Sequence, residues 1–271
     1  MKKLLLYNVL LMFLFTSCVK EDVTLNNNII VLGHGGMGIG KTYPMNSYES
    51  IIKCLNVGTD GTEIDVQMTK DSVLVAYHGS DLSDETNLSG SINSFNWSEI
   101  ENAFYTNTPY LNYSLISLDQ LFSNISNLKD YKFTFDCKLY KRKNTVNFQG
   151  EYITSLVKII DKHDLKNSVY IESQDTSFLI KLKERDSDYK LFIYPSSFDE
   201  GFQTALDLDL YGITISTKHV SQKQIEKAHS NNLKIAIWNT HSNTKNAEGV
   251  KKGPDFIQTD NVRHLVDLIK K

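Results

Sequence analysis

The sequence predicts an α/β fold of the (β/α)₈ TIM-barrel class, with a small insertion after the second strand. Eight short apolar runs are bounded by turn residues, and amphipathic segments alternate with them along most of the chain. Such alternation indicates a parallel sheet, and a count of eight favours a closed barrel over an open doubly wound sheet. The length of 271 residues is sufficient for one barrel domain.

The individual elements follow from these patterns. We expect strands at residues 29–32, 62–68, 131–139, 168–173, 190–194, 211–215, 233–238 and 255–258. Three helix starts are indicated by a capping side chain three residues before Glu or Gln, at Asn46 with Glu49, Ser117 with Gln120, and Ser221 with Gln224. Further helices are expected at 152–163, 177–184, 200–206, 242–250 and 262–269.

Residues 79–116 interrupt the alternation. This segment lies between a strand and the next helix and is too long for an ordinary connection, so we expect an insertion with a function. It carries Phe95, Trp97, Phe104 and several tyrosines. These rings could line a substrate entrance, but a small satellite core is the favoured role for most of them.

The N-terminus has the pattern of a secretory signal. Lys2 and Lys3 precede an apolar run within residues 1–17, and that run is short for a membrane span. Cys18 stands where a lipoprotein signal would be cleaved and the cysteine acylated. We therefore expect a lipid-anchored linker at 18–28, a barrel domain at 29–271 and an exported protein on the outer membrane, facing the periplasm or the cell surface. The alternatives are an uncleaved anchor or a plain secretory signal.

Composition excludes several classes of protein. Hydrophobic residues make up 41% and charged residues 23% of the chain, which are ordinary globular values. The formal net charge is −3, and removal of a leader with two lysines would make it more negative, so nucleic acid is not an expected partner. Apart from Cys18, only Cys54 and Cys137 are cysteines, and no closely spaced Cys/His set suggests structural zinc.

Acidic residues on the second expected strand suggest a metal site. Because side chains alternate along a strand, Glu63, Asp65 and Gln67 share one face while Ile64, Val66 and Met68 share the other. Two carboxylates inside a barrel would repel each other unless a cation lay between them. On this strand alone, a solvated acidic face is an equally good interpretation.

The third expected strand repeats the pattern. Asp136 lies on its polar face and can complete an oxygen cage for Mg²⁺ or Ca²⁺ with Glu63 and Asp65, and Lys138 can contact a phosphate. A simple ion pair between Asp136 and Lys138 is the alternative. The acidic pair on the preceding strand favours the metal site.

Two histidines are candidates for proton transfer. His34 ends the first expected strand, and His78 follows the apolar run 73–77. Histidine donates and accepts protons near neutral pH, and strand ends are where barrels place reactive groups. The other five histidines are expected on helices or loops and receive no role.

Taken together, these motifs resemble the glycerophosphodiester phosphodiesterase family. The segments GHGG, PMNSYESI, GTEIDVQMTKDSVLVAYHGSDL and TNLSGSI are similar to that family's HRG, PEN, E-x-D with TKDG, HD and TxxG motifs. FTFDCK resembles its E-x-K, and IAIWNT and PDFIQTD resemble its tryptophan strand and final TD. The resemblance covers nearly all of the chain after Cys18.

The resemblance implies a metal-dependent hydrolase of glycerophosphodiesters that releases an alcohol and glycerol phosphate. It implies His34 and His78 as general acid and base, Glu63, Asp65 and Asp136 as ligands of Mg²⁺ or Ca²⁺, and Lys138 and Trp238 as substrate-binding residues. This sequence departs from the family at Gly35, Met45 and Gly79, where Arg, Glu and Asp are usual, and at Asp136, where Glu is usual. An altered substrate or weaker activity is therefore expected.

Two rival interpretations remain. Residues 35–42 match the phosphate-binding P-loop pattern G-x-x-x-x-G-K-T, but Pro44 falls where the following helix should continue, so the match is interpreted as accidental. A barrel that binds a phosphodiester or glycan without cleaving it is the rival of a different class. The substitutions at Gly35, Met45 and Gly79 motivate it.

Overall fold

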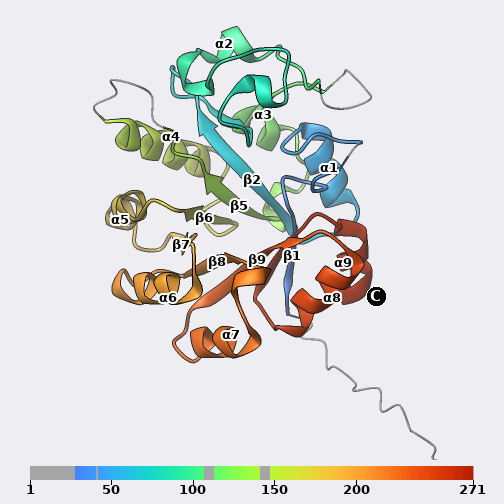
Figure 1. Cartoon of the computed structure of the whole chain (residues 1–271). Coiled ribbons are helices and arrows are strands. Elements are labelled where there is room, and N and C mark those ends of the chain that lie inside the picture. The colour runs from blue at the N-terminus through green and yellow to red at the C-terminus, as the bar shows by residue number, and fades with distance from the viewer. Residues whose placement is uncertain (1–27, 41, 107–112, 141–146, 271) are drawn as a thin grey trace, which may run out of the picture.

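Eight parallel strands form a closed barrel in the computed structural model, which describes residues 28–40, 42–106, 113–140 and 147–270 (Figure 1). β1 pairs with β10 on one side and with β2 on the other, which closes the ring. The eight barrel strands are β1 Ile30–Gly33, β2 Gly61–Met68, β5 Lys132–Cys137, β6 Val169–Ser173, β7 Lys190–Ile193, β8 Gly212–Ser216, β9 Lys234–Thr240 and β10 Phe256–Thr259. The expected barrel is therefore confirmed.

Helices surround the barrel between consecutive strands, as Figure 1 shows. They are α1 Tyr48–Asn56, α3 Leu118–Ser123, α4 Phe148–Lys162, α5 Thr176–Arg185, α6 Phe198–Asp207, α7 Gln222–His229, α8 Asn243–Lys251 and α9 Val262–Lys270. The capping boxes expected at Ser117 and Ser221 form. In the described part of the chain, no helix is both long and apolar enough to cross a membrane.

The first helix start differs from the expectation. Ser47, not Asn46, caps α1 and accepts a hydrogen bond from the backbone N–H of Ser50. Asn46 is fully buried in a left-handed conformation with φ of 64°, and its side chain turns towards the barrel instead. The sequence pattern indicated Asn46 as the residue that caps this helix. In the structure its side chain instead bonds to Asp65, which is distant in sequence.

The alternation of side chains on the strands separates two apolar layers. The outward residues of β2, including Ile64 and Val66, pack with the helices in the main core, as the sequence predicted. The inward residues at the start of the strands form a plug of aromatic rings, in which Tyr170 and Phe192 each contact Phe256 edge to face. This plug fills one end of the barrel. The polar inward residues follow it along the strands, towards the other end.

The insertion adds two short antiparallel strands to the edge of β2 and forms its own hydrophobic core. β3 Leu74–Ala76 pairs antiparallel with β2, and β4 Ile116–Ser117 pairs with β3. Between them lie two 3₁₀ turns and the short helix α2 Trp97–Ile100. The expected satellite core is confirmed: its buried members are Val75, Tyr77, Leu82, Ile92, Ile100, Ala103, Tyr105 and Leu115, with Phe95 and Trp97 packed against it.

Candidate active site at the open end of the barrel

Three carboxylates meet inside the barrel. One oxygen each of Glu63, Asp136 and Glu172 lies within 4.8 Å of the others, and all three residues are buried. Parallel pairing sets Asp136 of β5 beside Glu172 of β6, and the inward face of β2 supplies Glu63. Residues from three strands thus converge in one position that could hold a metal ion.

Burial makes this cluster unfavourable without a cation. Burial and the neighbouring charge of Asp65 hold the pKa of Glu63 well above its usual range. Burial and the charge of Asp136 raise the pKa of Glu172 to about 8. Burial also raises the pKa of Asp136, although Lys138 opposes that effect. A divalent cation would relieve both the desolvation and the mutual repulsion.

The hydrogen bonds of the cluster fit a metal site. Glu63 accepts a bond of 2.7 Å from the backbone N–H of Gly35 through Oε2, while its buried Oε1 has no hydrogen-bond partner among the described residues. Thr214 and Gln258 donate to Oε2 of Glu172, at 2.6 and 3.1 Å. Such outer contacts orient ligand carboxylates, and the free oxygen of Glu63 is available to an ion.

Asp65 lies beside the three carboxylates but has other partners. Asn46 donates to its carboxylate over 2.7 Å and accepts from its backbone N–H over 3.0 Å. Lys138 forms an ion pair with it at 3.0 Å. Burial would raise the pKa of Asp65, but Lys138, His78 and the other neighbours lower it overall. The three carboxylates that meet, Glu63, Asp136 and Glu172, form a triad that is called geometric below. It contains Glu172 where the sequence analysis expected Asp65.

Lys138 links the two acidic strands. Its ammonium nitrogen lies 2.5 Å from Asp136 and 3.0 Å from Asp65. Burial would lower its pKa, but these two carboxylates raise it well above the usual value, so the charge is retained. The ion pair left open by the sequence is present, and it includes both aspartates. Two ion pairs do not exhaust an ammonium group, which has three N–H donors.

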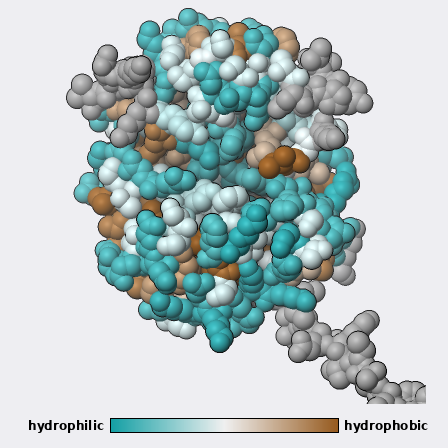
Figure 2. Space-filling view, in the orientation of Figure 1, coloured by the Kyte–Doolittle hydropathy of each residue, from teal (hydrophilic) through white to brown (hydrophobic). Residues whose placement is uncertain are grey.

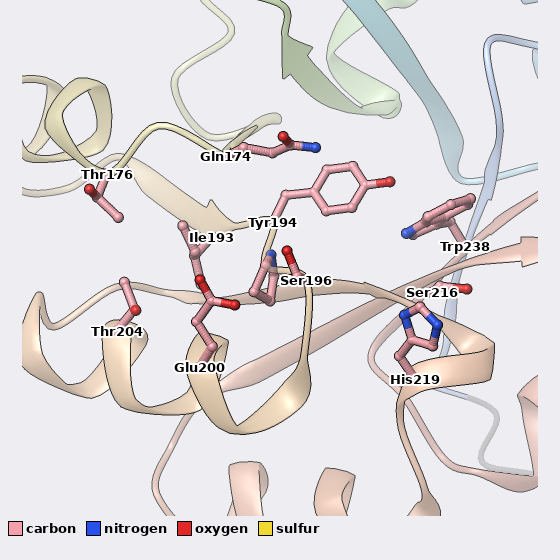
Figure 3. A pocket seen from close by; sticks show the side chains of 11 residues that line it. Gln174, Thr176, Ile193, Tyr194, Ser196, Glu200, Thr204, Ser216, His219 and Trp238 are labelled. Carbon is pink, nitrogen blue, oxygen red and sulfur yellow. The ribbon is translucent and has the colours of Figure 1, made fainter.

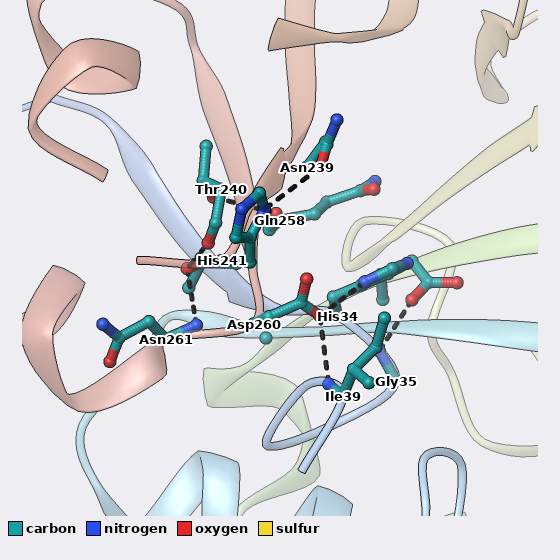
Figure 4. Close-up of polar contacts among 12 residues, drawn as sticks. His34, Gly35, Ile39, Asn239, Thr240, His241, Gln258, Asp260 and Asn261 are labelled. Carbon is teal, nitrogen blue, oxygen red and sulfur yellow. Dashed lines mark hydrogen bonds and ion pairs between the residues drawn. The ribbon is translucent and has the colours of Figure 1, made fainter. Parts of the chain in front are cut away.

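His34 is oriented by a carboxylate from the end of the chain. Its Nδ1 lies 2.8 Å from Oδ1 of Asp260, just after β10, and the same oxygen accepts from the backbone N–H of Ile39 (Figure 4). Burial would lower the pKa of His34, but the hydrogen bond and charge of Asp260 outweigh it and raise the pKa. The pair fixes the ring and leaves Nε2 available for proton transfer.

His78 and Trp238 complete the residues predicted from sequence. His78 is exposed and follows β3. It lies close enough to Asp65 and Glu85 to interact with both electrostatically, so it is near the acidic residues of the site. The Trp238 ring of β9 lies 6.4 Å from the ring of His34. In the orientation of Figure 1, hydrophilic residues occupy much of the centre of the molecular face that Figure 2 shows. The structure thus gathers every expected site residue that it describes at one end of the barrel.

Two departures from the family motifs contact each other. Gly35 has a φ of +57°, and a Cβ built on it would lie 2.8 Å from Cε of Met45. Gly79 is similarly restricted, since a Cβ there would lie 2.7 Å from Oδ2 of Asp84. Gly35 and Met45, which replace the usual Arg and Glu of the family motifs, are therefore packed together. The side chain of Asp84 occupies the space next to Gly79.

The P-loop pattern is not realised in the fold. A phosphate-binding loop leads directly from its last glycine into a helix, whereas residues 42–47 are bends and turns and α1 begins only at Tyr48. The described part of residues 35–42 therefore lacks the loop-to-helix geometry that a P-loop requires. Cys18 lies outside the described residues.

Sequence reasoning missed three residues of the site. Glu172 comes from β6, where the inward alternation could have indicated it, and Asp260 ends the PDFIQTD motif. Asn46 was interpreted as a helix cap. No local pattern shows that these residues face His34 or the acidic strands, because their contacts depend on closure of the barrel.

Comparisons with known proteins agree with this geometry. Residues 37–264 match the profile described as "Glycerophosphoryl diester phosphodiesterase family". A glycerophosphodiester phosphodiesterase of Caldanaerobacter subterraneus subsp. tengcongensis is 24% identical over 246 residues, which cover 89% of this chain and 98% of that protein.

Solved structures share the fold at low sequence identity. A phosphodiesterase from Oleispira antarctica, in complex with the product sn-glycerol-3-phosphate, is 18% identical with a TM-score of 0.77, covering 89% of this chain and 96% of that one. A glycerophosphodiester phosphodiesterase from Parabacteroides distasonis is 19% identical with a TM-score of 0.75, covering 90% and 97%. These similarities support the same barrel architecture.

Proposed function

Because this chain belongs to the glycerophosphoryl diester phosphodiesterase family, we propose that it hydrolyses glycerophosphodiesters to an alcohol and glycerol phosphate with the help of a divalent metal. The single observation that supports this most is the buried triad of Glu63, Asp136 and Glu172 with an unpartnered oxygen on Glu63. A barrel without a cation-dependent function has little reason to bury three adjacent carboxylates, because their desolvation is costly.

The proposed ligands are Glu63, Asp136 and Glu172, with Asp65 held beside them by Asn46 and Lys138. All are oxygen donors, which suit Mg²⁺ or Ca²⁺. Bound there, the ion would supply positive charge to the phosphate oxygens and so lower the energy of the pentacoordinate transition state.

The remaining steps use residues of the chain. The ammonium of Lys138 offers a further N–H to a phosphate oxygen. One of His34 and His78 takes a proton from the attacking water as its oxygen bonds to phosphorus, and the other gives a proton to the departing alkoxide as the P–O bond to the alcohol breaks. Asp260 holds His34 in one orientation and stabilises its protonated form, which suits either role.

We also propose an exported, membrane-anchored lipoprotein, on the sequence evidence of residues 1–18 alone. The protein would then encounter its substrates, glycerophosphodiesters derived from phospholipids, outside the cytoplasm. Fractionation of the Cys18 variant described below tests this proposal separately from the activity.

The activity is tested by measuring alcohol release from glycerophosphocholine, glycerophosphoethanolamine and glycerophosphoinositol. We expect turnover that EDTA abolishes and that Mg²⁺ or Ca²⁺ restores. A protein that binds the ion by calorimetry but cleaves no diester would instead be a binding barrel. Release of phosphate from ATP is the control for the rejected P-loop interpretation.

A further inference from the structure

A cavity of about 460 Å³ is lined by residues at the ends of β6, β7 and β8 and by Trp238 of β9. That volume lies within the range of small-molecule sites. Tyr194 and Trp238 line the cavity and connect it to the proposed active site. The Trp238 ring lies 6.4 Å from the ring of His34. Burial raises the pKa of Tyr194, and the nearby charges of Asp136 and Glu172 add to that effect. A diester with its phosphate at the triad can therefore extend one of its two alcohol groups into this cavity.

The lining of the cavity is rich in hydrogen-bonding side chains. Figure 3 shows Trp238 and His219 at one end, Glu200 and Thr204 of α6 at the other, and Ser196 between them. The remaining polar side chains that line it are Gln174, Thr176 and Ser216. Hydroxyl, amide, imidazole and carboxylate groups thus surround the space from several directions.

Two aromatic residues give the cavity a partly apolar wall. The rings of Tyr194 and Trp238 lie 5.7 Å apart, edge to face. The Nε1 of Trp238 is buried and has no hydrogen-bond partner among the described residues, so this donor is unsatisfied. Aromatic faces that cover C–H surfaces, combined with hydrogen-bonding groups that meet hydroxyls, match the alternating character of a sugar or cyclitol ring.

We propose that this cavity is a subsite for a hydroxyl-rich alcohol group of the substrate, such as a cyclitol or sugar, and that Glu200 is a residue that determines this specificity. The proposal rests on the proposed function and names its substrate class. Glu200 would accept hydrogen bonds from two neighbouring hydroxyls through its two carboxylate oxygens.

A quaternary ammonium group fits the lining less well. Recognition of such a cation relies on several aromatic faces, and the pair here is packed edge to face. Its methyl groups would also cover the hydroxyl and amide groups of Ser196, Thr204 and Gln174 without satisfying them, which costs free energy.

The test compares Glu200→Gln with Asp199→Asn. Both residues are acidic and lie in the first turn of α6, but only Glu200 lines the cavity. We expect Glu200→Gln to lower kcat/KM on glycerophosphoinositol about tenfold more than on glycerophosphocholine, because a charge-assisted hydrogen bond is lost. Asp199→Asn should leave both values unchanged.

An equal loss on both substrates, or a larger loss on glycerophosphocholine, would overturn the subsite. If the parent cleaves no diester, the proposed function fails, and the subsite is tested by calorimetry with inositol 1-phosphate and phosphocholine. Tighter binding of the inositol ester that depends on Glu200 supports the subsite, and equal binding of the two rejects it.

Discussion

Nδ1 of His34 lies 2.8 Å from Oδ1 of Asp260, although 226 residues separate them along the chain. Closure of the barrel between β1 and β10 produces this contact, since Gly33 and Thr259 are direct neighbours in that pairing. A histidine from the first strand and an aspartate just after the last one therefore act as one unit.

Replacement of either proposed catalytic histidine should remove turnover without unfolding the protein. We expect His34→Gln and His78→Gln each to reduce kcat by about 10²- to 10⁴-fold, the usual contribution of a positioned proton-transfer group. Neither side chain belongs to an apolar core cluster, so circular dichroism should be unchanged. His229→Gln, on α7, is the control, and near-parental activity of either first variant would remove that residue from the mechanism.

Asp260→Asn should change the pH dependence of the reaction. Asp260 raises the pKa of His34, so the loss of its negative charge should lower that pKa. If His34 is the general base, the acidic limb of the kcat/KM profile moves to lower pH, and if it is the general acid, the basic limb does. One limb thus moves to lower pH in either case. A profile that keeps both limbs in place would show that the pair does not titrate during turnover.

The metal ligands can be distinguished by comparing two carboxylates of the site. Glu172→Gln alters the geometric triad, whereas Asp65→Asn alters a group held by Asn46 and Lys138. We expect Glu172→Gln to weaken Mg²⁺ or Ca²⁺ binding more in calorimetry and to lose the rise in Tm that the ion gives to the parent. The reverse order would restore Asp65 as the ligand and exclude Glu172.

Gly35→Arg should lower activity and stability, because its left-handed backbone and its contact with Met45 both oppose a side chain. The backbone part is worth about 1 kcal/mol, and Gly253→Ala measures it alone, since Gly253 has a φ of +71° and nothing within 4 Å of its Cβ position. The double variant Gly35→Arg with Met45→Glu should recover part of the loss in Tm and kcat/KM. Higher kcat/KM for the single variant on both glycerophosphocholine and the parent's best substrate would contradict the expectation that the changes at Gly35 and Met45 adapt the site to an altered substrate.

Cys18→Ser should release the protein from membranes or leave its signal uncleaved, because Cys18 is the proposed acylation site. Membrane fractionation and the mass of the mature chain measure the two effects. Cys54→Ser is the matched control, since Cys54 is a buried free cysteine of the barrel domain. Normal processing and unchanged fractionation of the Cys18 variant would refute the lipid anchor.

The sequence by itself determined the strands and the faces of their side chains. A strand has a period of two, so the alternation in β2 placed Glu63 and Asp65 on one side and Ile64 on the other before any partner strand was known. The capping box at Ser117 was equally readable, because its bonds lie within four consecutive residues. Fold class, the acidic strands and the two strand-end histidines followed from such local patterns.

Only the tertiary structure decided which of the inward residues meet. The register between β5 and β6 sets Asp136 beside Glu172. The side chain of Lys138 extends to Asp65 and forms an ion pair with it. Asn46 resembled a local cap, yet its amide bonds to Asp65 of β2, and the backbone of Asn46 is left-handed instead of having the extended conformation of the actual cap, Ser47. These contacts depend on how the strands are staggered around a closed ring, and residues far apart in sequence carry no local signal of that arrangement.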